Sequence, residues 1–189
     1  KGGGGLYARL VVGAVLLAAG ESRRMGGRPK PLLELAGVPL IRRSLIALSG
    51  AGVDEVVVVT GHRADEVERS VADFPVTLAH NADYARGQAG SVRAGLAALQ
   101  GKLDAVIVAL ADQPLLNAQD ITELIAAFKR RGDAAVVIPR VDGERANPIV
   151  IGAGVRDEIL AGDVDLGCRK WIASHPARVM HFDTNNAHF

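Results

Sequence analysis

An apolar run that ends in a basic, glycine-rich loop constrains this sequence most. Residues 11–19 read VVGAVLLAA, and after Gly20 residues 21–30 read ESRRMGGRPK. A continuous apolar run of this length is typical of a strand buried on both faces. Glycines let main-chain N–H groups approach a ligand, and Arg and Lys side chains add positive charge. The pattern therefore predicts a buried strand that leads into an anion-binding loop, suited to a triphosphate.

The two common phosphate-binding motifs do not match this loop. A P-loop requires G-x-x-x-x-G-K followed by Ser or Thr, whereas Lys30 comes three residues after Gly27 and is followed by Pro31. The G-x-G-x-x-G spacing of dinucleotide-binding proteins is also missing from the loop. The loop therefore indicates another class of nucleotide site.

Composition and charge narrow the class of protein. With 189 residues, 49% of them hydrophobic, residues 11–189 are expected to form a single domain, and residues 1–10 (KGGGGLYARL) a flexible leader or cloning remnant. The net charge of +1 mixes both signs, which argues against nucleic acid or a membrane as a partner. A single cysteine, Cys168, fits a reducing cytoplasm.

Short apolar runs alternate along the chain with amphipathic segments. Strands are expected at 11–19, 56–59, 76–78, 105–110, 134–138, 148–151 and 178–182, and helices at 39–50, 64–72, 91–99, 117–131, 155–160 and 166–173. The helix from Asn117 has the clearest signals, with an N-cap residue, Asp120 in its first turn and basic residues before Gly132. This order predicts an α/β, Rossmann-like three-layer fold, with a mostly parallel, mixed central sheet and helices on both faces.

Ligands of such sheets bind outside the carboxyl ends of the strands. Besides the basic loop, two segments are expected there: Asp112 to Pro114, which follow the strand at 105–110, and Tyr84 to Arg93, in which the small residues 87–91 open a helix. Mg²⁺ takes one or two protein carboxylates together with phosphate oxygens, so Asp112 is the candidate metal ligand. The alternative is that Asp112 only caps the turn before Pro114.

The loop and its flanks match the signature LAAGxSxRMGxxK of nucleotidyltransferases. The matching residues are Leu17, Ala18, Ala19, Gly20, Ser22, Arg24, Met25, Gly26 and Lys30. Supporting segments follow in the order typical of this family: PKPLLELAGVPLIRR, VVVVTGH, NADYARGQAGSVRAGLAAL, ALADQP, ANPIVI and DLGCRKWI. The chain thus resembles the nucleotidyltransferase (NTP transferase) family, and within it the molybdenum cofactor cytidylyltransferases.

The resemblance implies a role for each matching position. The nucleotide-binding residues it implies are Leu17, Ala18, Ala19, Gly20, Arg24, Lys30, Gly87, Gln88 and Ser91; Arg24, Lys30 and Asp112 are the catalytic ones, and Asp112 is the Mg²⁺ ligand. Asn147 is the candidate that the resemblance gives for contact with the acceptor. His62 is a second candidate because it follows the strand at 56–59, and the alternative is that it is only a loop residue. The sequence departs from the pattern at three places. Ala146 stands where a glycine is usual, and Gln88 and Gly90 stand where serines are common. FDTNN is a poor match to the late acidic segment that commonly supplies a second metal ligand, so either that segment lies beyond residue 189 or the metal is bound differently, and Asp183 is the late candidate.

The reaction that this resemblance implies is transfer of a nucleoside monophosphate to a phosphorylated acceptor, with release of pyrophosphate. The acceptor would be molybdopterin, the nucleotide CTP or GTP, and the protein partner a molybdoenzyme or its chaperone. CMP is favoured because Ala19 stands where guanylyl-transferring relatives tend to have glycine, and its Cβ narrows the space beside the turn. Two alternatives are a sugar phosphate or other small phosphate as acceptor, and a non-catalytic nucleotide-binding or partner-binding domain.

Overall fold

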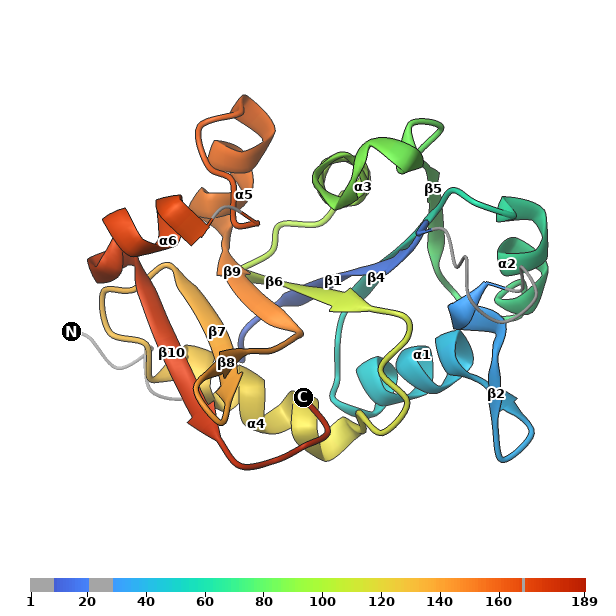
Figure 1. The fold of residues 1–189 in the computed structure, drawn as a ribbon, viewed down its shortest axis with the longest axis horizontal. Coiled ribbons are helices and arrows are strands. Elements are labelled where there is room, and N and C mark those ends of the chain that lie inside the picture. Colours follow the sequence, from blue (N-terminus) through green and yellow to red (C-terminus); the bar gives the residue numbers. More distant parts are fainter. Residues whose placement is uncertain (1–8, 21–28, 168) are drawn as a thin grey trace.

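The computed structural model describes residues 9–20, 29–167 and 169–189. A central sheet runs through the molecule and separates two layers of helices (Figure 1). Its strand order is β10-β7-β9-β6-β1-β4-β5, with β8 paired to β7. The strands are β1 (Val12–Ala18), β4 (Glu55–Thr60), β5 (Thr77–His80), β6 (Ala105–Leu110), β7 (Val136–Val141), β8 (Glu144–Arg145), β9 (Ile149–Gly152) and β10 (Val179–Thr184).

Helices cover both faces of the sheet (Figure 1). On one face lie α1 (Leu40–Gly50), α2 (Ala64–Ser70) and α4 (Ala118–Lys129), and on the other α3 (Gln88–Ala98), α5 (Ala153–Ala161) and α6 (Arg169–Ser174). Short 3₁₀ turns are η1 (Lys30–Leu32), η2 (Tyr84–Arg86) and η3 (Pro176–Arg178). β1 pairs in parallel with β4 and β6, whereas β9 runs antiparallel to β6 and β7. The predicted three-layer fold with a mostly parallel, mixed sheet is confirmed.

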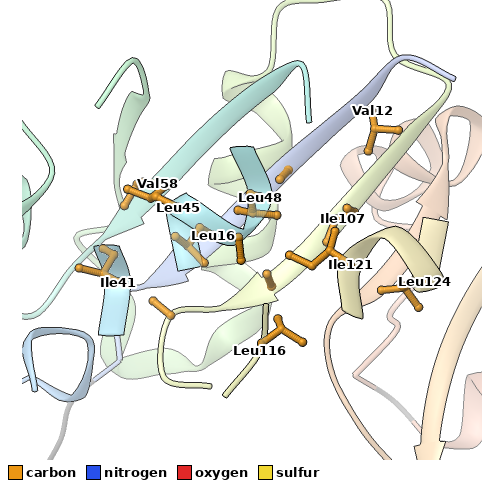
Figure 2. Close-up of a cluster of buried hydrophobic side chains, with 14 of the residues drawn as sticks. Val12, Leu16, Ile41, Leu45, Leu48, Val58, Ile107, Leu116, Ile121 and Leu124 are labelled. Carbon is orange, nitrogen blue, oxygen red and sulfur yellow. The ribbon is translucent and has the colours of Figure 1, made fainter. Parts of the chain in front are cut away.

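The core forms because β1 is apolar on both of its faces. Side chains alternate across a strand, so Leu16 packs with α1 and α4 on one side, and Leu17 packs with α3 on the other. Figure 2 shows the first of these clusters, in which Leu16 lies among Leu45 and Leu48 of α1, with Ile121 of α4 nearby. All seven residues of β1 are buried. The continuous apolar run of the sequence is therefore the central strand of the sheet.

Helix α4 begins as its sequence predicts. The Asn117 side chain accepts a hydrogen bond from the main-chain N–H of Asp120 at 2.9 Å, and the Asp120 carboxylate accepts one from the N–H of Asn117 at 3.0 Å. This reciprocal capping box gives hydrogen-bond acceptors to two main-chain N–H groups that have no partner within the helix. Asp120 is buried and also accepts from Asn186, so it ties the C-terminal segment to the start of α4.

Two local features were not predicted. β2 (Glu34–Leu35) and β3 (Val38–Pro39) form a hairpin, whose turn residues Ala36 and Gly37 have φ values of 52° and 79°. Two consecutive residues with positive φ form the type of two-residue turn that matches the twist of the flanking strands. Helix α3 begins at Gln88 and not at Ser91, because Gly87, with φ of 115° and ψ of 176°, turns the chain directly into the helix.

The described part of the expected leader contacts the domain. The Arg9 guanidinium forms an ion pair with Asp54 at 2.6 Å and donates to the main-chain oxygen of Gly52 at 2.9 Å. Leu10 packs against the core. Among the described residues, no helix combines the length and the apolar character that crossing a membrane requires.

Candidate active site

A cavity of about 280 Å³ opens where the carboxyl ends of β1 and β6 meet. The two strands lie side by side in parallel, with Leu17 opposite Leu110, so the segments that follow them leave the sheet at the same edge. The residues that line the cavity are Leu17, Ala18, Ala19, Gly20, Lys30, Pro31, Tyr84, Gly87, Gln88, Ser91, Leu110 and Asp112. We call this space the first cavity.

The first cavity brings together most of the residues selected from the sequence. Nine of its lining residues belong to the predicted nucleotide, catalytic and metal set: Leu17, Ala18, Ala19, Gly20, Lys30, Gly87, Gln88, Ser91 and Asp112. Segments that are about 80 residues apart in the sequence thus share one space. Arg24 lies outside the described residues, as do the other basic residues of the 21–28 loop, so its role stays a prediction.

Sequence reasoning missed three lining residues: Pro31, Tyr84 and Leu110. Pro31 follows Lys30, and Leu110 is the last residue of a predicted strand, so both could have been found from their neighbours. Tyr84 begins the segment 84–93 that was expected at this edge of the sheet, but it was not assigned a role; in the structure it lies in the turn η2. Its side chain reaches the site through the packing of η2 onto the end of β4.

Gly61, directly after β4, permits that packing. A Cβ placed on Gly61 would lie 2.7 Å from Tyr84 Cβ and 2.8 Å from the main-chain oxygen of Ala19. The next residue, His62, donates its main-chain N–H to the same oxygen at 3.1 Å. The His62 and Tyr84 rings are 5.9 Å apart, centre to centre, and His62 itself does not line the first cavity. His62 therefore supports one wall of the cavity through Tyr84.

The start of α3 forms another wall and is held by a buried amide. Asn81 donates from Nδ2 to Ser91 Oγ at 2.9 Å, and its Oδ1 accepts the main-chain N–H of Asp83 at 3.0 Å. Asn81 and Ser91 are both buried. This pair fixes the first turn of α3 against the turn that carries Tyr84. The first N–H groups of a helix have no partner within the helix and favour an anion.

Asp112 is half-buried at the end of β6 and lines the first cavity. Within the described ranges, it does not belong to any group of three or more His, Cys, Asp or Glu side chains that could hold a metal ion by themselves. A single carboxylate fits a metal that completes its coordination with phosphate oxygens and water, as Mg²⁺ does.

Asp183, the late candidate for a second metal ligand, lies elsewhere. It is on β10, which is separated from β6 by β7 and β9. Arg140 donates to both of its carboxylate oxygens, at 2.7 and 3.0 Å, and this hydrogen bonding holds the pKa of Asp183 below its ordinary value. The strand order thus separates Asp183 from Asp112, so the structure does not place this late candidate beside the proposed metal ligand.

A second cavity, of about 260 Å³, adjoins the first. The two cavities share Leu17, Gln88 and Leu110 in their linings. Asn147 lines the second cavity, and His62 lines neither. The side-chain amide of Gln113 donates to the main-chain oxygen of Asn147 at 2.8 Å, so the loop that carries Asp112 is bonded to the loop that carries Asn147. The structure therefore does not bring the two predicted acceptor residues into one cavity.

The fold and the cavity together define a nucleotidyltransferase-type α/β domain, with its site at the carboxyl ends of parallel strands. The chain belongs to the family described as the MobA-like NTP transferase domain, whose model matches residues 14–179. The predicted membership of the NTP transferase family is confirmed at this level.

Named relatives and a solved structure are similar to most of the chain. It is 33% identical over 150 residues to the bifunctional protein GlmU of Sorangium cellulosum, covering 76% of this chain and 31% of that protein. It is 31% identical over 170 residues to the nicotine blue oxidoreductase of Paenarthrobacter nicotinovorans, covering 87% of this chain and 83% of that protein. The chain thus spans about a third of GlmU and most of the second relative.

The structure of a nucleotidyl transferase from Methanothermobacter thermautotroptrophicus superposes with a TM-score of 0.75 at 28% identity. The match covers 93% of this chain and 88% of that one. The α/β architecture is therefore shared over nearly the whole chain.

Proposed function

We propose that this protein transfers a nucleoside monophosphate from a nucleoside triphosphate to a phosphorylated acceptor, in a Mg²⁺-dependent reaction that releases pyrophosphate. We favour CMP as the group transferred and molybdopterin as the acceptor. The observation that carries the proposal is that Lys30 and Asp112, a cation and a carboxylate from distant segments, line one cavity with the main chain of residues 17–20. A metal-bound triphosphate needs this combination of charges.

The main chain of residues 17–20 supports the nucleotide end of this site. β1 ends in the cavity, and its last residues are buried, so their main-chain groups have a fixed direction. Gln88 and Ser91 border the same space from the first turn of α3. We assign base and ribose binding to these two segments, and triphosphate binding to Lys30 together with Arg24.

Asp112 would hold Mg²⁺, which supplies charge stabilisation to the phosphate oxygens when bound. The reaction needs no covalent intermediate on the protein. An oxygen of the acceptor phosphate attacks the α-phosphorus, the bond to the bridging β-phosphate oxygen breaks, and pyrophosphate leaves. Because the acceptor phosphate is already ionised at neutral pH, the chain's residues need only position the groups and balance negative charge.

The second cavity supports a place for the acceptor beside the nucleotide. It shares a wall with the first cavity, and it contains Asn147, whose main-chain oxygen is bonded to the residue next to Asp112. An acceptor seated there would face the α-phosphate of a nucleotide in the first cavity. We assign Asn147 to acceptor binding, and His62 to the nucleotide side through its packing on Tyr84.

A panel of the four ribonucleoside triphosphates with molybdopterin and with sugar phosphates, read by pyrophosphate release, tests the proposal. We expect release that depends on Mg²⁺, on an acceptor and most strongly on CTP. If a sugar phosphate supports pyrophosphate release and molybdopterin does not, the acceptor is a sugar phosphate and not molybdopterin. Because a relative covering most of the chain is named an oxidoreductase, the panel also decides whether this domain is a transferase. Nucleotide binding without pyrophosphate release from any pair would favour a non-catalytic domain.

A further inference from the structure

The second cavity combines apolar walls with arginine. Its lining residues are Leu17, Gln88, Ala89, Val92, Arg93, Val108, Leu110, Arg145, Asn147, Ile149, Ile159, Gly162, Val164, Asp165, Leu166 and Gly167. The charged members are Arg93, Arg145 and Asp165, so cations outnumber anions. The Asp165 carboxylate is engaged with the main-chain N–H of Gly167, at 3.0 Å. The cavity is therefore suited to a ligand with an apolar body and an anionic group.

Arg145 is held in place without a carboxylate. Its Nη1 donates to the main-chain oxygen of Leu166 at 2.6 Å, and no described carboxylate forms an ion pair with it. A guanidinium has five N–H donors arranged as a planar fork, and a bond through Nη1 leaves others to bind an anion. Arg145 as a residue remains exposed to solvent, so a ligand can reach it.

The neighbours of Arg145 increase the positive charge at this position. Its partner across the β7–β8 pairing is Arg140, whose charge is offset by the two hydrogen bonds to Asp183. Partial burial, and next the positive charge of Arg169, lower the pKa of Arg145. An anion bound at Arg145 would offset the positive charge of Arg145 and Arg169, as the Asp183 carboxylate offsets the charge of Arg140.

The chain also aims Arg145 and Asn147 at the same space. The two residues are separated by Ala146 alone, and both line the second cavity. Asn147 is bonded in turn to Gln113, the residue after Asp112. The segment from Arg145 to Asn147 thus carries a guanidinium of the second cavity and is hydrogen-bonded to the residue next to Asp112, the proposed metal ligand.

We propose that Arg145 binds the phosphate of the acceptor and so determines that the acceptor is a phosphate ester. This inference rests on the proposed function, because it places the acceptor in the second cavity. It assigns to Arg145 a specificity role that Asn147, an uncharged side chain, cannot supply. A planar guanidinium binds phosphate through two parallel hydrogen bonds, which the single ammonium of lysine cannot reproduce.

Calorimetric titration of inorganic phosphate tests this assignment. The protein is first saturated with Mg²⁺ and a non-hydrolysable CTP analogue, so that the nucleotide's phosphates occupy the first cavity. We expect Arg145→Gln to weaken phosphate binding by about tenfold or more, as the loss of charge-assisted hydrogen bonds does. Arg145→Lys should fall between the wild type and Arg145→Gln. Binding of the CTP analogue should be the same in all of these proteins.

Arg156 offers a matched control. Its guanidinium also bonds only main-chain oxygens, those of Leu96 and Leu99 at 3.1 and 2.7 Å, and it does not line the second cavity. Arg156→Gln should therefore keep the wild-type affinity for phosphate. An equal loss in Arg156→Gln and Arg145→Gln would overturn the proposal, because it would mean a general loss of local structure. Equal phosphate affinity in Arg145→Gln and the wild type, or no phosphate binding in the wild type, would overturn it too.

The same variants separate this inference from the proposed function. If turnover is found and Arg145→Gln leaves the KM of the acceptor unchanged, the function stands and the role of Arg145 falls. If no combination of nucleotide and acceptor releases pyrophosphate, but Arg145→Gln binds phosphate more weakly than the wild type, the anion site is supported and the transfer reaction is not.

Discussion

The side-chain amide of Gln113 donates a hydrogen bond to the main-chain oxygen of Asn147, and the distance between the two atoms is 2.8 Å. This bond joins the loop that follows β6 to the segment that leads into β9. It connects the two cavities mechanically, because Asp112 and Asn147 border one cavity each. The other amide atom, Gln113 Oε1, is buried and has no hydrogen-bond partner among the described residues.

Gln113→Ala should loosen this connection. We expect faster amide hydrogen exchange in residues 146–150 and a loss of about 1 kcal/mol in unfolding free energy, which is typical of one hydrogen bond. Hydrogen-exchange mass spectrometry and urea denaturation measure the two effects. Gln100→Ala, at an exposed position after α3 where no hydrogen bond of the side chain is described, is the control and should change neither. Unchanged exchange in residues 146–150 would mean that the bond does not position Asn147.

Asp112→Asn should abolish Mg²⁺-dependent turnover and leave the fold intact. The substitution keeps the shape of the side chain but removes the negative charge, so we expect a loss of about 10²-fold or more. Pyrophosphate release over a range of Mg²⁺ concentrations measures it, with circular dichroism as the check on folding. Asp133→Asn, an exposed residue before β7, is the control. A wild-type rate at saturating Mg²⁺ would assign Asp112 to capping the turn before Pro114.

Lys30→Gln should lower turnover by about 10²-fold, because a positioned charge on the reacting phosphates is lost. Lys30 is exposed in η1 and lines the first cavity, so its removal should cost little stability. The rate of pyrophosphate release and the melting temperature are the two measurements. Lys102→Gln, an exposed lysine outside the first cavity, is the control. An unchanged rate would make Lys30 a surface charge.

Ala19→Gly should shift the nucleotide preference from CTP towards GTP. Ala19 is buried at the end of β1 and lines the first cavity, and its Cβ would lie 2.9 Å from a Cβ placed on Gly61. Its removal widens this wall, and one steric contact of this kind changes relative affinity by about 1 to 3 kcal/mol. Titration of both nucleotides with Mg²⁺ measures the shift. If wild-type protein binds GTP as tightly as CTP, base selection belongs to another segment, such as residues 87–91.

Gly95→Ala should destabilise the fold. A Cβ on Gly95 of α3 would clash with Val15 Cγ1 and lie 2.9 Å from Val59 Cγ2, so the helix would have to move off the sheet. Overpacking of this kind costs about 1 to 3 kcal/mol. Gly154→Ala is the control, because a Cβ there meets nothing within 4 Å. Since alanine suits a helix better than glycine, this control should unfold at the same or a higher urea concentration.

Local patterns in the sequence predicted most of the elements because each is encoded by adjacent residues. The run at 11–19 is buried on both faces as β1, and Asn117 caps α4 because its partner Asp120 is three residues away. The hairpin at Glu34–Pro39 was missed, since its turn has alanine where such turns usually place asparagine or aspartate. The start of α3 was misplaced because Gly87 turns the chain one residue before the helix.

The sequence by itself determined that a buried strand precedes the loop at Gly20, that Asp112 follows another such strand, and that helices separate the strands. Only the tertiary structure decided that β1 and β6 are neighbours, which places Leu17 beside Leu110 and Asp112 in the same cavity. It also placed Asp183 away from Asp112, and it brought Arg145 to the second cavity. Strand order depends on how whole layers of helices pack against the sheet, and residues that are adjacent in sequence do not encode that packing.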